Sequence, residues 1–300
     1  MIQTTKTQQS KTINMAQNIM KPSEINVNNL KFSEPKKLPN GGNKVYVNSN
    51  GGTLYVQTPE VKVLWDTKFY PGDNEGSGNY PVVFSLSNME SNSSMKAFHD
   101  MLASLDEHIV NLAYENRKAW FGAKLAKANI ETIQQLYTPM VKVHIDKETG
   151  EPSGKFPPSF GLKINMWDGK HQCKVYNQNK ELFNIDDKDA DDFKSLNEDI
   201  LVKGTGIKVL LKCHGIWIIS GKFGCTWRAE QVKVKLSEKV SGYAFRDDDD
   251  DDNMDVVEDK VEEDGAVDMI VDSDSDSDTD SEEEQEPVKK PVKKRGVKKQ

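Results

Sequence analysis

The chain has 300 residues, of which 36% are hydrophobic and 29% charged, and its formal net charge is −8. This length allows one large domain or two small ones, and the hydrophobic fraction lies below the roughly 45–50% (glycine included) of globular chains, so part of the chain packs into no core. No apolar run reaches the ~18 residues of a membrane span, residues 1–20 lack the apolar segment of a secretory signal, and three cysteines are too few for a disulfide framework, which favours a reducing intracellular setting.

The charge is distributed very unevenly. Residues 247–286 hold 22 acids and one base, residues 287–300 hold seven bases and no acid, and residues 1–246 carry a net charge of +6. Residues 1–43 are polar and broken by three prolines and a Gly-Gly pair. We therefore predict a disordered polar arm (1–43), one folded domain (44–246), a disordered acidic tail (247–286) and a basic tip (287–300).

Alternating hydrophobicity predicts strands in the first part of the folded domain, around residues 45–47, 54–56, 61–65 and 82–86. Trp65 alternates with Val61 and Val63, so we expect it in the core. A helix is predicted next, because apolar residues recur at helical spacing, and Ser93 or Ser94 is its expected N-cap. The residues of that apolar face are Phe98, Leu102, Leu105, Ile109 and Leu112.

A second, shorter helix is predicted over residues 130–137, ending before Pro139. Strands then resume at residues 140–145, 162–167, 170–176, 207–213, 216–220 and 223–236. The predicted fold class is mainly β with one inserted α-helix. Many short strands around one helix favour a small barrel or a sandwich, and an oligonucleotide-binding (OB) barrel is the first choice.

The clearest local signal is the pair Asp168-Gly169, which predicts a two-residue hairpin turn. The turn sets a register in which Trp167 faces Lys170, Asn165 faces Gln172 and Lys163 faces Lys174. Opposed lysines repel unless an anion lies near them, and aromatic rings among lysines suit bases and phosphates of a single nucleic-acid strand. The predicted outer face carries Lys163, Asn165, Trp167, Lys170, Gln172, Lys174 and Tyr176.

A second candidate surface of the same kind lies between residues 207 and 228. If His214-Gly215 is a two-residue turn, Lys212 faces Trp217, and Lys208 shares their face. A Gly-rich hairpin then brings together Lys222, Phe223, Trp227 and Arg228, with the outward-facing aromatics left open by a register ambiguity of one residue. The candidate nucleic-acid contacts from this surface are Lys208, Lys212, Trp217, Lys222, Phe223 and Arg228.

The sequence predicts a non-catalytic protein that needs no cofactor or metal. It contains no Walker motif, and Gly204-Thr205-Gly206 lacks the third glycine of a dinucleotide site. Five residues in principle suit zinc but lack CxxC spacing, so we interpret them as buried small residues and ordinary polar positions. These are His171, Cys173, Cys213, His214 and Cys225.

The acidic tail contains a run of hydroxyl residues that alternate with acids, which is typical of acceptors for acid-directed kinases. Each phosphate would add about −1.5 to −2 charge to the tail. The candidate phosphorylation sites are Ser273, Ser275, Ser277, Thr279 and Ser281. The basic tip after them fits a nuclear-import signal or a second nucleic-acid arm.

Four segments resemble a family of single-stranded DNA-binding proteins of large nucleocytoplasmic DNA viruses, itself similar to the phage T-seven-type proteins. The segments are residues 54–65, 98–120, 156–164 and 203–228, and the last is the most specific. The resemblance covers about residues 44–236 and implies an OB-fold, sequence-independent binding of single strands, and an acidic tail that contacts replication proteins. The chain departs from the phage pattern in its longer tail, which ends in Lys299-Gln300 instead of an aromatic residue.

These observations lead to one main hypothesis and two alternatives. The main hypothesis is a single-stranded DNA-binding protein of a viral replication apparatus inside the host cell, in cytoplasm or nucleus, acting in replication, recombination or repair. Its expected partners are single-stranded DNA and, through the tail, replication proteins; no membrane is involved, and a homo-oligomer is compatible with the sequence. The first alternative is an acidic interaction factor of the histone-chaperone type. A metal-dependent nucleic-acid enzyme is the second, and it lacks a cluster of carboxylates in the folded domain.

Overall fold

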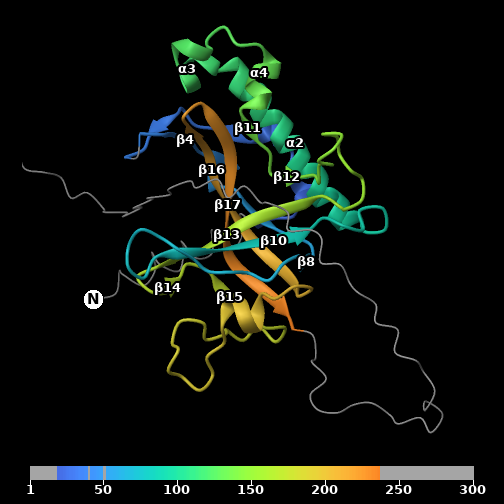
Figure 1. The fold of residues 1–300 in the computed structure, drawn as a ribbon, viewed down its shortest axis with the longest axis vertical. Helices are drawn as coiled ribbons and strands as arrows, with labels where there is room; N and C mark the ends of the chain where they lie inside the picture. Colours follow the sequence, from blue (N-terminus) through green and yellow to red (C-terminus); the bar gives the residue numbers. More distant parts are fainter. Residues whose placement is uncertain (1–18, 40, 50–51, 237–300) are drawn as a thin grey trace, which may run out of the picture. The chain divides into compact units, whose positions relative to one another are not determined.

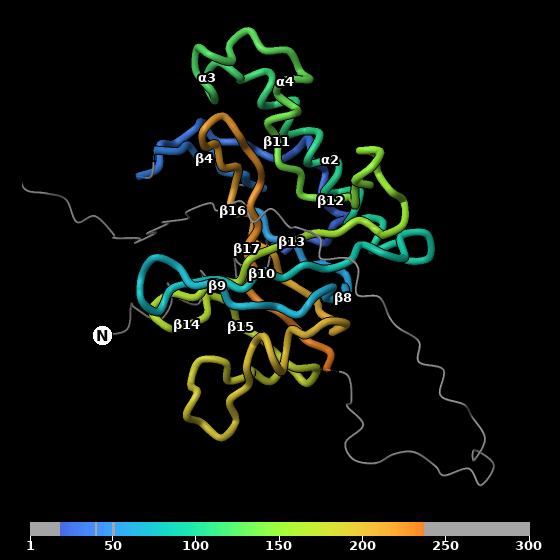
Figure 2. The backbone as a smooth tube through the Cα atoms, in the orientation of Figure 1, coloured from blue at the N-terminus to red at the C-terminus, as the bar shows by residue number. Residues whose placement is uncertain are grey.

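A computed structural model describes residues 19–39, 41–49 and 52–236, and Figures 1 and 2 trace their path. The predicted tail, tip and phosphorylation sites lie outside these residues. The helical elements are η1 (Pro22–Glu24), η2 (Val27–Asn29), α2 (Ser93–Glu115), α3 (Arg117–Phe121), η3 (Ala123–Leu125), α4 (Ile130–Gln135) and η4 (Leu196–Ile200). No helix in this part of the chain is long and apolar enough to cross a bilayer.

Strands make up most of the fold. They are β1 (Ile19–Met20), β2 (Lys31–Phe32), β3 (Lys36–Lys37), β4 (Asn43–Val45), β5 (Val47–Ser49), β6 (Gly52–Thr53), β7 (Tyr55–Gln57), β8 (Val61–Val63), β9 (Tyr70–Pro71), β10 (Gly78–Ser85), β11 (Tyr137–Thr138), β12 (Val141–Lys142), β13 (Ser159–Trp167), β14 (Lys170–His171), β15 (Lys174–Tyr176), β16 (Gly206–Ile219) and β17 (Lys222–Lys235). The prediction of a mainly β protein with an inserted helix is confirmed.

Five strands close into a ring. β8 pairs with β10, β10 with β13, β13 with β17, β17 with β16, and β16 again with β8. All of these pairings are antiparallel except that of β13 with β17, which is parallel. A five-stranded barrel of this kind, partly open and closed by one parallel contact, is the OB-fold that the sequence pattern favours.

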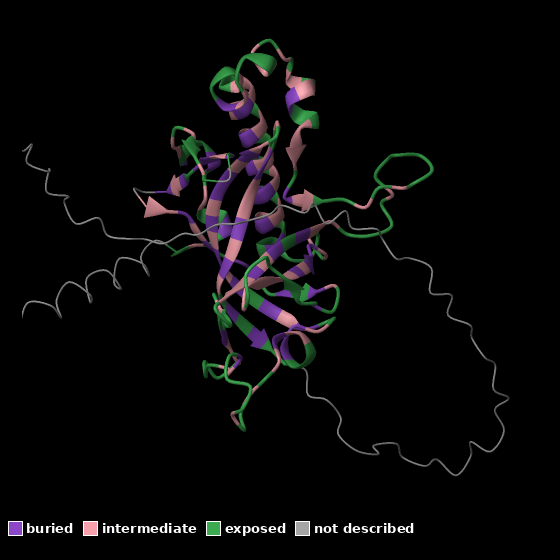
Figure 3. Ribbon diagram, turned by 60° about the vertical axis from the view of Figure 1, so that its left-hand side comes forward, coloured by how far each residue is buried: buried purple, intermediate pink, exposed green. Residues whose placement is uncertain are grey.

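The hairpin of β16 and β17 is the longest element of the barrel. Its two strands have 14 residues each and meet at a turn formed by Ser220 and Gly221, which have φ angles of 51° and 86°. Positive φ at both positions produces a turn whose twist matches that of the flanking strands. Buried residues alternate with half-buried or exposed ones along most of both strands (Figure 3).

The turn predicted at His214-Gly215 is wrong, because β16 continues through these residues with a β-bulge between Cys213 and Gly215. Gly215 has a φ of 115°, and a Cβ there would lie 2.6 Å from the carbonyl oxygen of Val45 on β4. Only glycine permits this backbone conformation and this close approach. The glycine therefore lets β4 pair beside the bulge and does not reverse the chain.

Helix α2 packs along the barrel with the predicted apolar face inward. Phe98, Leu102, Leu105 and Ile109 are fully buried, whereas Leu112 is only half-buried. The Phe98 ring lies 6.4 Å and 5.9 Å from the rings of Phe84 and Phe160. The N-cap is Asn92, one residue before the predicted serines; its side-chain oxygen accepts hydrogen bonds from the N–H groups of residues 94 and 95.

The folded region begins before residue 44. Residues 19–43 contain four short strands or strand starts and two 3₁₀ turns, and Val27 and Leu30 belong to the same core as the barrel. The disordered arm predicted for residues 1–43 is therefore wrong for residues 19–43, and residues 1–18 lie outside the described part. The apolar residues of this segment are isolated among polar ones, so they form no helix or strand period that the sequence could reveal. The segment is ordered by its tertiary contacts with the core.

Asp106 fastens α2 to the segment that leads into β12 and β13. Its carboxylate accepts hydrogen bonds from the hydroxyl of Tyr137 and from the N–H groups of Met140 and Val141. Burial raises the pKa of the Asp106 carboxyl, against the effect of these hydrogen bonds. Burial also raises the pKa of the Tyr137 hydroxyl, so this group remains a donor to Asp106.

We predict that Asp106→Ala lowers the free energy of unfolding by about 2–4 kcal/mol, because it leaves one hydroxyl and two N–H groups without their partner in a buried place. Urea denaturation measures the loss. Asp100→Ala is the matched control, since Asp100 forms an exposed ion pair with Lys96 on the same helix and its removal costs under about 1 kcal/mol. Equal losses would contradict the role of Asp106.

Candidate functional site

The predicted hairpin at Asp168-Gly169 forms the end of β13 and β14. Both turn residues have positive φ, 49° and 73°. Trp167 pairs with Lys170, as predicted. The N–H of Gln172 donates to the carbonyl oxygen of Asn165 at 2.8 Å, which extends the predicted register by one more pair. The turn also docks on the loop after β9, where the N–H of Gly169 donates to Gly76.

The predicted pairing of Lys163 with Lys174 is wrong. After Gln172 the chain bends away, and β15 pairs with β17, so that Lys174 lies beside Gln231. Lys163 instead has Arg228 of β17 as its partner. A hairpin turn determines the register only as far as the two strands remain neighbours, and here a third strand competes for the same edge.

One row of residues crosses the outer surface of the barrel. Lys212 of β16 pairs with Arg228 of β17, which pairs with Lys163 of β13. Their chain neighbours are buried, so these three side chains point outward. The row continues to Tyr55 of β7 beyond Lys212. Three cations from different parts of the sequence thus lie on adjacent strands.

A groove with a volume of about 190 Å³ follows this row. The guanidinium carbon of Arg228 lies 5.5 Å from the centroid of the Trp167 ring, within range of a cation–π interaction. Glu230 is the one acid in the lining, and its carboxylate lies 3.6 Å from Nζ of Lys212. The lining residues are Lys163, Asn165, Trp167, Gln172, Lys212, Arg228, Ala229 and Glu230.

Two exposed aromatic residues did not follow from the sequence pattern, and one of them, Tyr70, lies beside the groove. Tyr70 of β9 pairs with Asn79 of β10, which pairs with Asn165, so Tyr70 shares the outer face and is 41% exposed. Trp65 was expected in the core but is 49% exposed, and Nζ of Lys203 lies 6.0 Å from its ring. β8 ends at Val63, so strand alternation no longer determines where Trp65 points.

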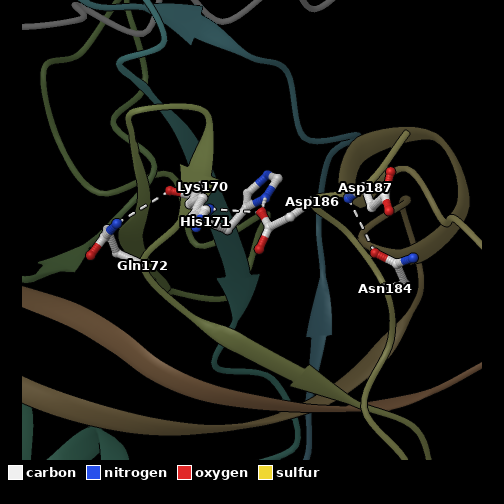
Figure 4. Close-up of polar contacts among 6 residues, drawn as sticks. All are labelled: Lys170, His171, Gln172, Asn184, Asp186 and Asp187. Carbon is white, nitrogen blue, oxygen red and sulfur yellow. Dashed lines mark hydrogen bonds and ion pairs between the residues drawn. The ribbon is translucent and has the colours of Figure 1, made fainter. Parts of the chain in front are cut away.

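A polar contact holds the far side of the hairpin in place. The Asp186 carboxylate accepts a hydrogen bond from the N–H of His171 and lies 2.7 Å from Nδ1 of the same residue (Figure 4). The same view shows Gln172 donating to the carbonyl of Lys170, and the N–H of Asp187 donating to Asn184. The contacts of Asp186 with His171 tie the loop after β15 to β14, the strand that follows the Asp168-Gly169 turn.

The other predicted site residues fall into separate places. Tyr176 and Lys208 lie on either side of Lys233 in one outward row of β15, β17 and β16. Lys170, Lys174 and Lys222 are exposed, and Trp217 is half-buried. The structure therefore gathers Lys163, Asn165, Trp167, Lys212 and Arg228 into one groove and leaves the remaining candidates outside it.

Phe223 is the one candidate that the structure removes. Its side chain is fully buried and lies within 5.0–6.2 Å of the rings of Trp120, Phe121 and Tyr137, measured between centroids. Trp227, left open by the sequence, is also buried and directs its indole nitrogen at the sulfur of Met140. The ambiguous register is resolved by the turn at residues 220–221, which directs residues 223 and 227 inward.

The cysteine and histidine residues considered for zinc do not form one cluster. Sγ of Cys213 and Sγ of Cys225 lie 3.7 Å apart, and His171 contacts Asp186 elsewhere. Burial and Glu230 raise the pKa of the Cys173 thiol to about 12. Within residues 19–39, 41–49 and 52–236, no group of three or more His, Cys, Asp or Glu side chains is arranged to hold a metal ion.

Comparisons with known proteins give one family match and several remote structural likenesses. A model of the family of unknown function DUF5871 matches residues 82–247. No curated protein matches the chain.

Among solved structures, the chain is similar to a C-terminal truncation of the single-stranded DNA-binding protein from bacteriophage Enc34, at 11% identity and a TM-score of 0.36, covering 70% of this chain and 97% of that chain. The Enc34 protein in complex with single-stranded DNA matches at 12% identity and a TM-score of 0.33, covering 69% and 97%. This chain is also similar to gp2.5, a single-stranded DNA-binding protein encoded by bacteriophage T7, at 13% identity and a TM-score of 0.36. The match covers 65% of this chain and 100% of gp2.5. Because these TM-scores are low, the barrel is identified from the strand pairings of this chain and not from its similarity to the phage proteins.

Phe223 is buried and Trp167 lies at the surface of the groove, so replacing them should reduce stability by different amounts. Phe223→Ala should lower the free energy of unfolding by about 3–5 kcal/mol, because it empties a packed aromatic cluster. Trp167→Ala, on the surface of the groove, should cost clearly less. Urea denaturation of both variants measures the difference, and a larger loss from Trp167→Ala would place that ring in the core.

Proposed function

The chain belongs to the DUF5871 family of unknown function, and we propose that it binds single-stranded DNA without sequence preference and without catalysis. One observation carries this proposal: Lys212, Arg228 and Lys163 lie side by side on three adjacent strands in the groove that Trp167 lines, with Arg228 against the Trp167 ring. Like charges placed directly opposite each other repel. Glu230 offsets part of this repulsion through Lys212, and a phosphate backbone would offset more.

The aromatic residues favour a single strand over a duplex. Trp167 lines the groove, and the 41% exposed Tyr70 shares its face. Base–aromatic stacking needs a free base face, which a single strand offers and a stacked duplex does not. In OB-folds the face of the second and third barrel strands is the one that takes oligonucleotides, and here those strands are β10 and β13.

The groove contains side chains that suit both parts of a nucleotide. Lys163 and Arg228 supply charge for phosphate oxygens, and the amides of Asn165 and Gln172 supply donors and acceptors for base edges or sugars. Glu230 holds one of the three cations, Lys212, in an ion pair. A net positive lining with aromatic rings fits binding that follows the backbone and tolerates any base.

We further propose a role for the acidic tail and a biological setting. The tail presents 21 net negative charges on the same chain as the basic groove, and a tethered competitor acts at an effective concentration in the millimolar range. It would weaken DNA binding until a replication protein captures it, and phosphorylation would strengthen the inhibition. The motif at residues 203–228 supports a role in viral DNA replication, recombination or repair inside the host cell.

We predict that the protein binds a fluorescent poly-dT strand more tightly than a duplex of equal length, and that the affinity falls as salt rises. For single strands log K falls by about 0.7 per log salt for each phosphate neutralised. Anisotropy titrations at several salt concentrations measure both. Binding that ignores salt, or that prefers the duplex, would refute the proposal.

Substitutions in the groove should separate stacking from charge. Trp167→Ala should weaken binding of the single strand by about 1–3 kcal/mol. Lys163→Ala should mainly lower the salt slope, by about 0.7. Lys96→Ala, which removes an equal charge from the exposed surface of α2, is the control and should change neither quantity. A loss of binding in all three variants would exclude a localised site.

Truncation tests the role of the tail. A chain ending at residue 246 should bind single-stranded DNA more tightly than the full chain, and more so at low salt, because screening already weakens the tail at high salt. A chain ending at Glu286 keeps the acids but loses the seven bases of the tip, and it should bind more weakly than the full chain. If the full chain and the chain ending at residue 246 bind DNA equally tightly at low salt, the tail does not inhibit binding and serves solubility or partner binding instead.

A further inference from the structure

A second basic and aromatic surface lies on the other half of β16, outside the groove. Lys36 of β3 pairs with Lys44 of β4, which pairs with Trp217 of β16, so these three residues form one row. Tyr46 follows Lys44 by two residues and is 39% exposed. We call Lys36, Lys44, Tyr46 and Trp217 the hairpin patch.

Both lysines of the hairpin patch lie against the same aromatic ring. Nζ of Lys36 and Nζ of Lys44 each lie 5.2 Å from the centroid of the Tyr46 ring. Lys44 is only 7% exposed, and its ammonium contacts Nε2 of His214 at the β-bulge. Residues 31–48 contain four lysines and one acid. The cation–π contacts offset part of the cost of bringing these lysines together, and the exposed Lys36 remains accessible to an anion from solution.

Trp217 is positioned by a glycine. The indole lies on Gly224 of β17, where an added Cβ would come within 2.9 Å of the ring. Its chain neighbours Ile216 and Ile218 are buried, so Trp217 faces outward and remains half-buried. The hairpin patch therefore presents the rings of Tyr46 and Trp217 and the exposed ammonium of Lys36, with the buried Lys44 beneath the Tyr46 ring, and so combines aromatic faces with positive charge as the groove does.

This combination fits a nucleic-acid strand better than an acidic peptide. The lysines alone would accept either, but the rings offer faces for planar bases to stack on. The acidic tail of this chain, residues 247–286, contains no Phe, Tyr or Trp and nothing else planar and aromatic to place there. An aromatic ring flanked by two cations is better matched by alternating bases and phosphates.

We propose that the hairpin patch is a second contact site for the single strand that occupies the groove, which rests on the proposed function. Lys212 of the groove and Trp217 of the hairpin patch are five residues apart on β16. At about 3.3 Å per residue their Cα atoms are roughly 16 Å apart along the strand. A stacked strand rises about 3.4 Å per nucleotide, so roughly five nucleotides join the two sites. A bound single strand would therefore contact a longer stretch of the protein surface than the groove alone.

The test compares oligo-dT of two lengths on the full-length protein by fluorescence anisotropy. An oligonucleotide of about 4 nucleotides is shorter than the separation of the two sites and fills the groove alone, whereas one of about 16 reaches both, at the upper end of the range known for OB-folds. Tyr46→Ala should weaken binding of the long strand about 5- to 100-fold and of the short strand less than about 2-fold. Trp167→Ala should weaken both. Tyr46→Phe keeps the ring and should retain wild-type affinity.

Two lysines of the same strand supply a matched pair for charge. Lys36 faces Lys44 in the hairpin patch, whereas its neighbour Lys37 pairs with Asn43 and points to the opposite face. Lys36→Ala should lower the salt slope for the long strand by about 0.7, and Lys37→Ala should leave it unchanged. Both residues are exposed, so neither change endangers folding.

The outcomes separate this inference from the proposed function. If neither strand binds the wild-type protein, the proposed function itself fails. If Trp167→Ala weakens binding but Tyr46→Ala and Lys36→Ala leave the long strand unaffected, the hairpin patch does not contact DNA and the inference is overturned. The same holds if these changes tighten binding, which would show that the hairpin patch holds the acidic tail, or if they weaken both lengths equally.

Discussion

The antiparallel pairing of β16 with β17 is the interaction on which the rest of the structure depends. Each strand is long enough to hold its partner and also several shorter strands: β4, β7 and β8 on the outer edge of β16, and β11, β13 and β15 on that of β17. Strands of two or three residues cannot form a stable sheet by themselves, so all of these except the nine-residue β13 depend on the hairpin for their position. The barrel closes because both edges of the same hairpin are used, with one parallel contact at Arg228 completing the ring.

The same hairpin arranges the outward side chains that we interpret functionally. Period-two alternation places Lys212 of β16 and Arg228 of β17 on the outer surface, and pairing brings Lys163 beside them. The bulge at His214 shifts the alternation by one residue, so that Trp217 also faces outward, further along the strand. One irregular position thus gives the strand two basic and aromatic surfaces in place of one. Helix α2 contributes nothing to either surface; it covers the core and is tied down by Asp106.

Local features of the site were readable from the sequence, and features that need a third strand were not. Asp168-Gly169 predicted both the hairpin and the pairing of Trp167 with Lys170, because a two-residue turn determines its own neighbourhood. The pairing of Lys163 with Lys174 failed, since β17 takes both residues as partners at different points. Trp65 lies just beyond β8 and Tyr70 in the two-residue strand β9, and neither position has enough alternation around it to indicate exposure.

By itself the sequence determined the class of the protein: a mainly β domain with one amphipathic helix, an OB-type barrel as the first choice, lysines alternating with aromatic residues, and a tail of one charge sign. These follow from composition and from periodicity within single elements, which are local properties of the chain. Only the tertiary structure decided that Lys163, Lys212 and Arg228 meet in one groove, that Phe223 is core, and that residues 19–43 join the fold. Each of these depends on contacts between segments far apart in sequence, and such contacts are selected by the packing of the whole core.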